Sequence, residues 1–298
     1  MNDNNSIFDS SRGATKEIIS NGGNAEATDA QLLTQFDTDG FTVGTNGGVN
    51  GSGDGYVAWQ WKANGGTTSS NSNGNSTTTV QANTTAGFSI VLGSFTGSTK
   101  TYGHGLGVAP DVVLWKNRSN TNSWLLFTTA VDGSHDYGIL NQANNFSATS
   151  YDVPSSTVFY GNDDASTNFV AYCFAQKQGF SKFASYTGNG NANGTFVYTG
   201  FKPAWLMIKN KTSTGNSWAI FDNKRSDVEG ANQIDREIAA NEDSAEYDRT
   251  NANMDFLSNG FKLRNTDGWH NTSGDTYFYM AFAENPFVTS SGIPTTAR

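Results

Sequence analysis

Alternation of large apolar residues with small or polar ones marks three runs of the chain as β-strands. In residues 57–61, 170–174 and 278–282, every second position carries a large apolar side chain, which is the period of a strand. We expect this apolar face to be core in all three runs. The opposite face varies in size and polarity, so we expect it to be only partly covered. The residues of the expected core face are Val57, Trp59 and Trp61, then Val170, Tyr172 and Phe174, then Phe278, Met280 and Phe282.

The three runs close copies of one repeated unit. Its first half occurs twice, at a nearly constant offset of about 90 residues, which is within the size range of a domain. Its second half occurs three times, beginning near Phe8, Phe127 and Phe221, so the halves follow the order second, first, second, first, second. In such an array, function lies in what differs between copies. The first halves match at Gly87-Phe88-Ser89 and Gly179-Phe180-Ser181, Pro110 and Pro203, Lys116-Asn117 and Lys209-Asn210, and Asn122-Ser123-Trp124 and Asn216-Ser217-Trp218.

Composition places the module boundaries. Residues 64–85 are nearly all Gly, Ser, Thr and Asn, which predicts a flexible or extended linker. We expect it to separate an N-terminal half-module, residues 1–63, from two full modules at 86–177 and 178–287, followed by a tail at 288–298. Frequent turn residues and short apolar runs predict an all-β fold of tandem β-sandwich modules, jelly-roll-like in type. The segment from residue 232, "NQIDREIAANEDSAEY", is interpreted as strand or loop rather than helix.

Charge and composition narrow the classes of partner. Lys and Arg total 18 against 27 Asp and Glu, a net charge of -9, which disfavours nucleic acid and anionic membrane surfaces. No apolar stretch approaches the roughly 20 residues of a membrane helix, and the first residues lack the pattern of a signal peptide. We therefore expect neither membrane insertion nor a secretion signal. The single cysteine, Cys173, aligns with Gln60 and Ala281 and is expected to be a packing residue.

Catalytic and metal-binding patterns do not emerge from the sequence. "GHGLG" at 103–107 leads into a β-like run, which predicts a turn rather than a phosphate-binding loop. "DTDG" at 37–40 and "NDDAS" at 162–166 lack the ligand spread of an EF-hand, so Asp-rich turns are favoured over surface calcium sites. We predict no catalytic residue, no metal and no cofactor. A carboxylate pair for glycoside cleavage stays open, because such pairing is spatial.

Two groups of residues are candidates for ligand binding: the basic ends of two matching strands, and the loop that precedes the last strand. Lys116-Asn117-Arg118 and Lys209-Asn210-Lys211 end matching strands, where solvated strand ends are favoured over a grip on an anionic sugar. Trp124 and Trp218 coincide in the repeat and are expected to be scaffold.

The loop "NTDGWHNTSGD" differs from the others, because the matching loops "TNGGVNGSGD" and "GNDDAST" hold no aromatic residue. Asp267, Trp269 and His270 are therefore the candidate ligand-binding residues. Trp269 would stack on a sugar ring while Asp267 and His270 orient polar groups, and the sparse charge nearby suits a neutral glycan. The alternative is that Trp269 folds back as a lid on its own sandwich.

The longest of these phrases carry a family resemblance. "GFSKFASYTGNGNANGTFVYTGFKPAWLMIKN", "DFLSNGFKLRNT" and "YFYMAFAENPF" resemble a repeated domain of uncharacterised function in structural, often tail-fibre-like, proteins of marine tailed bacteriophages. The resemblance covers residues 5–63 and 86–287. It implies a virion location after assembly in the host cytoplasm, with other virion proteins as partners, and it brings no catalytic residues.

These observations favour a non-enzymatic virion structural protein, a tail fibre or similar appendage that displays variable loops to a host-surface glycan. The alternatives are a spike enzyme that degrades surface polysaccharide, and a capsid decoration or head fibre protein. A homo-oligomer, with a trimer favoured, is expected from the threefold symmetry common in phage fibres. It is also expected because the half-module at 1–63 would expose an apolar edge unless another chain covers it.

Overall fold

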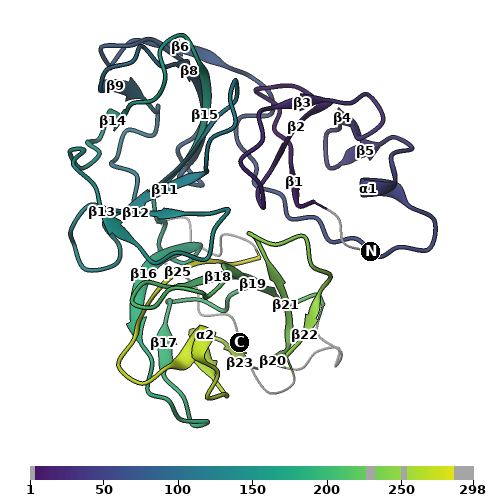
Figure 1. Cartoon of the computed structure of the whole chain (residues 1–298), viewed down its shortest axis with the longest axis vertical. Helices are drawn as coiled ribbons and strands as arrows, with labels where there is room; N and C mark the ends of the chain where they lie inside the picture. Colours follow the sequence, from purple (N-terminus) through teal and green to yellow (C-terminus); the bar gives the residue numbers. More distant parts are fainter. Residues whose placement is uncertain (1–3, 226–231, 250–253, 285–298) are drawn as a thin grey trace. The chain divides into compact units, whose positions relative to one another are not determined.

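The computed structural model describes residues 4–225, 232–249 and 254–284 (Figure 1). Over these ranges the chain forms short antiparallel strands and two helices of 4 residues each. The predicted all-β, sandwich-like fold is thus confirmed, and the segment from residue 232 is strand and loop as expected. The chain divides into two compact units, Met1–Phe127 with Ser150–Ala175, and Thr128–Thr149 with Gln176–Arg298.

Unit 1 contains one large sheet, a second two-stranded sheet and two N-terminal hairpin structures. In the large sheet, strands follow the order β11-β10-β15-β8-β7-β6, and β14 pairs with β9 in the small one. The N-terminal strands form the sheet β1-β2-β3 and the hairpin β4-β5. The elements are β1 (Ser6–Ile7), β2 (Lys16–Ile19), β3 (Ala27–Thr28), β4 (Leu33–Phe36), β5 (Phe41–Val43), α1 (Gly47–Asn50), β6 (Ser69–Asn71), β7 (Thr78–Asn83), β8 (Phe88–Ser94), β9 (Lys100–Gly103), β10 (Val112–Asn117), β11 (Leu125–Thr128), β14 (Val158–Gly161) and β15 (Asn168–Phe174).

Unit 2 is a two-layer sandwich. Its sheets have the orders β16-β25-β18-β19-β21-β22 and β17-β24-β23-β20, and the inner faces of both supply one hydrophobic core that includes Leu206, Phe256 and Tyr279. The hairpin β12–β13 also belongs to this unit. The elements are β12 (Asp136–Ile139), β13 (Ser147–Ala148), β16 (Ser181–Thr187), β17 (Phe196–Tyr198), β18 (Trp205–Asn210), β19 (Ala219–Asp222), β20 (Gln233–Ile234), β21 (Arg236–Ala239), β22 (Tyr247–Asp248), β23 (Met254–Leu257), β24 (Gly260–Leu263), α2 (Gly268–Asn271) and β25 (Thr276–Phe282).

The closing strand of the repeat is central in each unit. β15 lies between β10 and β8, and β25 lies between β18 and β16. The register is the same in both, since Val112 pairs with Phe174 in unit 1 and Trp205 pairs with Phe282 in unit 2. Every residue of β15 and β25 after the first is buried, which corrects the expectation of a partly covered second face. Cys173 is fully buried, so its packing role is confirmed, and burial raises the pKa of its thiol.

The first copy of the closing run is not a core strand, contrary to the sequence expectation. Val57, Trp59 and Trp61 are half-buried while Ala58 and Gln60 are exposed, so the period of two survives without a strand. The reason is positional: the strands that flank a closing strand come from a first half, and in unit 1 both β8 and β10 already pair with β15.

Residues 64–85 are structured, which corrects the interpretation of this segment as a flexible linker. They contain β6 and β7, and β7 pairs with β8 from Thr79↔Leu92 to Asn83↔Phe88. A strand needs only backbone groups to pair, so a Ser/Thr/Asn-rich segment can extend a sheet. Val80 and Gln81 of β7 are buried, and the amide of Gln81 bonds to Ser10 and Ser11.

A buried tryptophan joins each first half to the hairpin of the preceding second half. In unit 1 the indole Nε1–H of Trp124 donates to the carbonyl oxygen of Ile19, the last residue of β2, at 2.7 Å. In unit 2 the indole of Trp218 donates to the carbonyl oxygen of Ile139, the last residue of β12, at 2.9 Å. Both side chains are 0% exposed. Their predicted scaffold role is confirmed.

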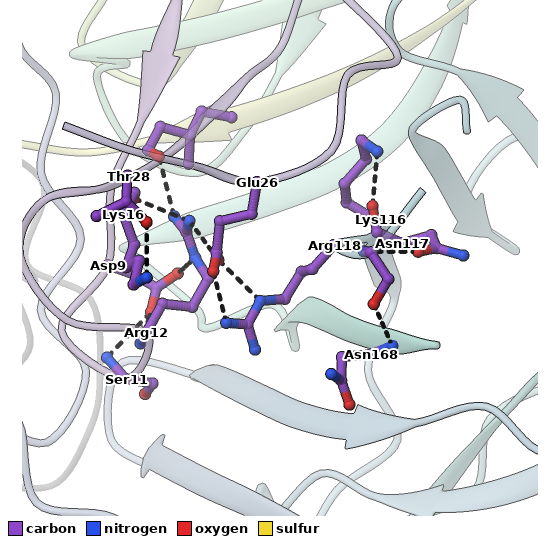
Figure 2. A network of polar contacts seen from close by, with 12 residues as sticks. Asp9, Ser11, Arg12, Lys16, Glu26, Thr28, Lys116, Asn117, Arg118 and Asn168 are labelled. Carbon is purple, nitrogen blue, oxygen red and sulfur yellow. Dashed lines mark hydrogen bonds and ion pairs between the residues drawn. The ribbon is translucent and has the colours of Figure 1, made fainter. Parts of the chain in front are cut away.

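An ion network, centred on a buried arginine, holds the N-terminal hairpin in unit 1 (Figure 2). The guanidinium of Arg12 contacts Asp9 and Glu26, and Arg118 donates two hydrogen bonds of 2.8 Å to the carboxylate of Glu26. Burial alone would raise the pKa of Glu26, but the two arginines hold it below its ordinary value. The hydroxyl of Tyr172, in the core strand β15, donates to Asp9 at 2.7 Å.

These contacts change the argument for oligomerisation. The N-terminal half-module contacts Trp124, Arg118 and Tyr172 of its own chain. An apolar edge that only a second chain could cover is therefore no longer a reason to expect a trimer. The trimer remains a proposal that rests on analogy with phage fibres.

We predict that Trp124→Phe and Trp218→Phe each lower the free energy of unfolding of their own unit by roughly 1 to 3 kcal/mol. Each variant removes an indole donor from a partly buried hydrogen bond and leaves a small cavity in place of the fully buried indole. Urea unfolding followed by circular dichroism measures the change. Tyr198→Phe, at a 66% exposed position, is the control and should stay within about 0.5 kcal/mol of the parent. Equal effects of all three variants would contradict the assignment.

Candidate functional site

The loop before the last strand is a short helix whose frame occurs twice in the chain. α1 and α2 stand at the same place in the repeat. In α1 the amide oxygen of Asn46 accepts from the backbone N–H of Gly48 at 2.8 Å. In α2 the carboxylate of Asp267 accepts from the N–H of Trp269 at 2.7 Å. Both are N-cap contacts, and the helical turn is not evident from the pattern of the sequence.

Two further pairs of residues repeat in this frame. Asn50 and Asn271 each donate from the side chain to a backbone carbonyl six residues earlier, at 2.8 and 2.7 Å. Tyr56 and Tyr277 each donate from the hydroxyl to the carbonyl of the first helical residue. The frame is therefore shared scaffold, whereas Trp269 replaces Gly48 and His270 replaces Val49. The indole is a feature of the third copy alone.

Trp269 is half-buried and stacks on a cation. The guanidinium carbon of Arg249 lies 4.4 Å from the centre of its ring and 4.8 Å from the centre of the Tyr247 ring. Arg249 in turn donates to the carboxylate of Glu237 at 3.3 Å. A cation over the face of an aromatic ring is attracted by the ring quadrupole, which favours this position of the indole. The arrangement is a firmly supported aromatic surface, half open to solvent.

His270 is not on that surface. Its side chain is 0% exposed, with Nε2 3.3 Å from Glu237 and Nδ1 3.6 Å from Asp267. The ring of Phe221 packs edge-on against it, with ring centres 5.3 Å apart. The predicted role of His270 in orienting a ligand is thus corrected: the imidazole is part of the interior. It replaces Val49 of the first copy, so it fills an apolar position of the frame.

Asp267 is committed to the helix cap and is only partly exposed. Its Oδ1 accepts from the N–H of Trp269, which positions the indole. Of the three predicted residues, Trp269 and Asp267 are partly exposed, and Asp267 holds the backbone of Trp269 in place. The structure brings all three together, in one turn.

Sequence reasoning missed the residues behind the indole. Glu237 belongs to β21, Tyr247 belongs to β22 and Arg249 follows β22, so all three lie some distance earlier in the chain. The hydroxyl of Tyr247 donates to Glu242 at 2.6 Å. Burial alone would raise the pKa of Glu242, but hydrogen bonds from Ser217 and Tyr247 hold this pKa below its ordinary value. The strand pairing places Ala27 where Tyr247 stands, so comparison of copies held a signal for this aromatic residue.

The basic strand ends are mostly engaged inside the protein, since Arg118 and Lys211 are partly exposed but ion-paired and the two lysines before them are buried. Lys116 and Lys209 are 0% exposed. The ammonium of Lys116 donates to the carbonyl oxygens of Gly23 at 3.1 Å and Asn117 at 2.6 Å, and that of Lys209 donates to the carbonyl of Asn216. The predictions of a solvated lysine and of a lysine that binds an anionic sugar are both corrected, because Lys116 and Lys209 are buried and hydrogen-bond to loop carbonyls. Burial lowers the pKa of each to about 8.

The remaining sequence motifs have plain structural roles. "GHGLG" is a turn, as predicted, with positive φ at Gly105 and Gly107, and the imidazole of His104 is buried. Among the residues that the structure describes, no group of three His, Cys, Asp or Glu side chains is arranged to hold a metal ion. Within the same ranges, no helix has the length and apolarity needed to cross a membrane.

A family model described as "Domain of unknown function (DUF7483)" matches residues 1–286, nearly the whole chain. The chain belongs to the DUF7483 family. No curated protein and no solved structure matches the chain. The match spans both compact units.

The buried lysines predict an unusual dependence of stability on pH. The pKa of Lys209 is about 8 in the folded chain, against an ordinary value of 10.5, so between these values the unfolded chain binds more protons. Stability contributed by Lys209 therefore rises with pH in this window, by roughly 1 to 2 kcal/mol between about pH 8 and pH 10. Urea unfolding of the parent and of Lys209→Met across that range measures the difference. Parallel pH profiles for the two proteins would contradict the prediction.

Proposed function

We propose that the protein is a non-enzymatic structural protein of a phage virion, a tail fibre or similar appendage, that recognises a glycan on the host surface. The resemblance of its longest motifs to a repeated domain of tail-fibre-like proteins supports the location. Stable β-modules that carry differing loops suit such a role, because rigid scaffolds with variable loops are where binding surfaces concentrate.

One observation supports the recognition part most strongly. α1 and α2 use the same frame, yet the third copy adds a half-exposed indole supported by Arg249 and Tyr247. A supporting stack of this kind has no counterpart at Gly48 in the first copy. An indole face can stack on the C–H face of a sugar ring.

The electrostatics of this site favour a neutral sugar. The cation beneath the indole is balanced by Glu237, which lies 3.2 Å from Nε of Arg249. The carboxylate of Asp267 is engaged by the backbone of the helix. Neither charge is thus offered to a ligand, which favours hydroxyl-rich neutral glycans over polyanions.

Assembly on a virion follows from the same proposal. Partners would be other virion proteins and further copies of this chain, with a trimer favoured by analogy with phage fibres. Membrane insertion and nucleic-acid binding are not part of the proposed role, in line with the net charge of -9.

We predict that Trp269→Ala weakens binding to host cells or to isolated host-surface glycan by roughly 1 to 3 kcal/mol, which is about 5- to 150-fold in affinity. The variant removes the stacking face and leaves the shared frame of α2 in place. Binding of the fluorescently labelled protein to cells that the phage infects measures the effect.

Phe41→Ala, at a 37% exposed aromatic position of unit 1, is the matched control and should bind like the parent. Circular dichroism and thermal unfolding establish that both variants fold. Parent-like binding by Trp269→Ala would refute the site, and unfolding of that variant would mean that the indole is a structural lid. Release of sugar from host envelope by the parent would refute the non-enzymatic role.

A further inference from the structure

A second aromatic surface lies on β17, far in sequence from α2. Phe196 is 44% exposed and Tyr198 is 66% exposed, while Val197 between them is 6% exposed and points into the core of unit 2. Alternation along the strand places both rings on the outer face of the sheet β17-β24-β23-β20. Exposed large aromatic side chains side by side on a rigid strand are uncommon without a partner.

The matching strand of unit 1 shows what this position normally holds. β9 pairs with β14 as β17 pairs with β24, since Tyr102↔Phe159 corresponds to Val197↔Phe261. Thr101 thus stands where Phe196 stands, and Gly103 stands where Tyr198 stands.

In unit 1, a strap of residues 71–78 covers the free edge of β9. The N–H of Ser76 donates to the carbonyl of Thr101 at 3.2 Å, and Thr101 N–H donates to the side chain of Asn75 at 2.8 Å. The hydroxyl of Thr78 donates to the carbonyl of Gly103 at 2.8 Å. The strap is an extended chain that offers hydroxyl and amide groups to the strand edge.

Tyr198 is not compatible with the strap as it lies in unit 1. A Cβ at Gly103 would lie 2.1 Å from Oδ1 of Asn71, so a side chain at this position would require that of Asn71 to move. The connection from β15 to β16 also spans only residues 175–180, which is too short to supply it.

The edge of β17 keeps its backbone groups available. Leu263 N–H donates to Thr195 O at 3.1 Å and Thr199 N–H donates to Asn259 O at 3.0 Å. Odd-numbered residues here therefore turn their backbone groups to β24, and Phe196 and Tyr198 turn theirs to the opposite side. Within 4–225, 232–249 and 254–284, no hydrogen bond reaches those groups from that side.

The two cations near the rings already have polar partners. Lys262, opposite Phe196 on β24, donates to the carbonyl of Gly194 at 3.0 Å. Arg264 pairs with Asp255 at 2.6 Å. A ligand at this edge would therefore meet aromatic faces, amide groups and carbonyls, beside one ammonium group that is already hydrogen-bonded.

We propose that the β17 edge binds a neutral glycan chain, with Phe196 and Tyr198 stacked on sugar rings and their outward backbone groups bonded to sugar hydroxyls. The ligand would take the place that the hydroxyl- and amide-rich strap takes in unit 1. This inference deepens the proposed glycan recognition and rests on it, but it assigns a site separate from Trp269.

The test uses the full chain and three neutral probes, cellohexaose, maltohexaose and chitohexaose, with affinity measured by isothermal titration calorimetry. The test variant is Phe196→Thr with Tyr198→Thr, which replaces both aromatic rings by the kind of residue found at Thr101. The matched control is Phe36→Thr with Phe41→Thr, another exposed aromatic pair, each 37% exposed. We expect the parent to bind at least one probe, the test variant to bind it at least tenfold more weakly, and the control to bind within twofold of the parent.

Several results would overturn the proposal. The proposal fails if the parent binds none of the three sugars. It also fails if the test and control variants lose affinity equally, or if a folded test variant binds with the affinity of the parent. Binding of a peptide copying residues 71–78, in place of the sugars, would mean that the edge takes a protein strand. If host cells bind the parent and the test variant equally while Trp269→Ala weakens binding, the proposed function stands and this site fails.

Discussion

The structure depends on a buried indole that reaches from one half of the repeat into the hairpin of the half before it. The side chains of Trp124 and Trp218 are fully buried, and each indole donates to the carbonyl of the last residue of a strand. Because the donor comes from the following half, neither half is complete alone, and the compact units do not coincide with consecutive stretches of chain. Unit 2 accordingly takes in residues 128–149, which precede β15 of unit 1 in the sequence. The halves are interleaved by packing.

Buried charge accompanies this docking and is satisfied locally. In unit 1, Arg118 beside the indole segment reaches Glu26 of the N-terminal hairpin, while Lys211 at the matching place in unit 2 reaches Asp132 and Asp136. A buried ion is tolerated only where partners replace its water, and the lysines before these residues meet that need with loop carbonyls. Charged residues in the shared part of the repeat therefore build the scaffold, and the proposed recognition rests on aromatic residues that differ between copies.

Sequence pattern predicted the β class, the repeat and the scaffold role of Trp124 and Trp218, because periodicity and internal matches report directly on buried faces. Sequence pattern failed where the structure of a segment depends on which strands lie beside it. The run at 57–61 has the right alternation but no flanking strands, and residues 64–85 form strands because an adjacent sheet edge accepts their backbone groups. At the site, comparison of copies singled out Trp269, whereas the burial of His270 and the stack with Arg249 depend on strands distant in sequence.

Hydrogen exchange of the tryptophan indole N–H groups tests the central claim most directly. With 15N-labelled tryptophan, two-dimensional NMR follows each indole proton after transfer to deuterated water, and Trp→Phe variants assign the signals. If indole docking holds the halves together, the protons of Trp124 and Trp218 exchange only through unfolding of their unit, with protection near its full free energy of unfolding. Exchange of either proton within minutes at neutral pH, under conditions where the core strands β15 and β25 stay protected, would contradict it.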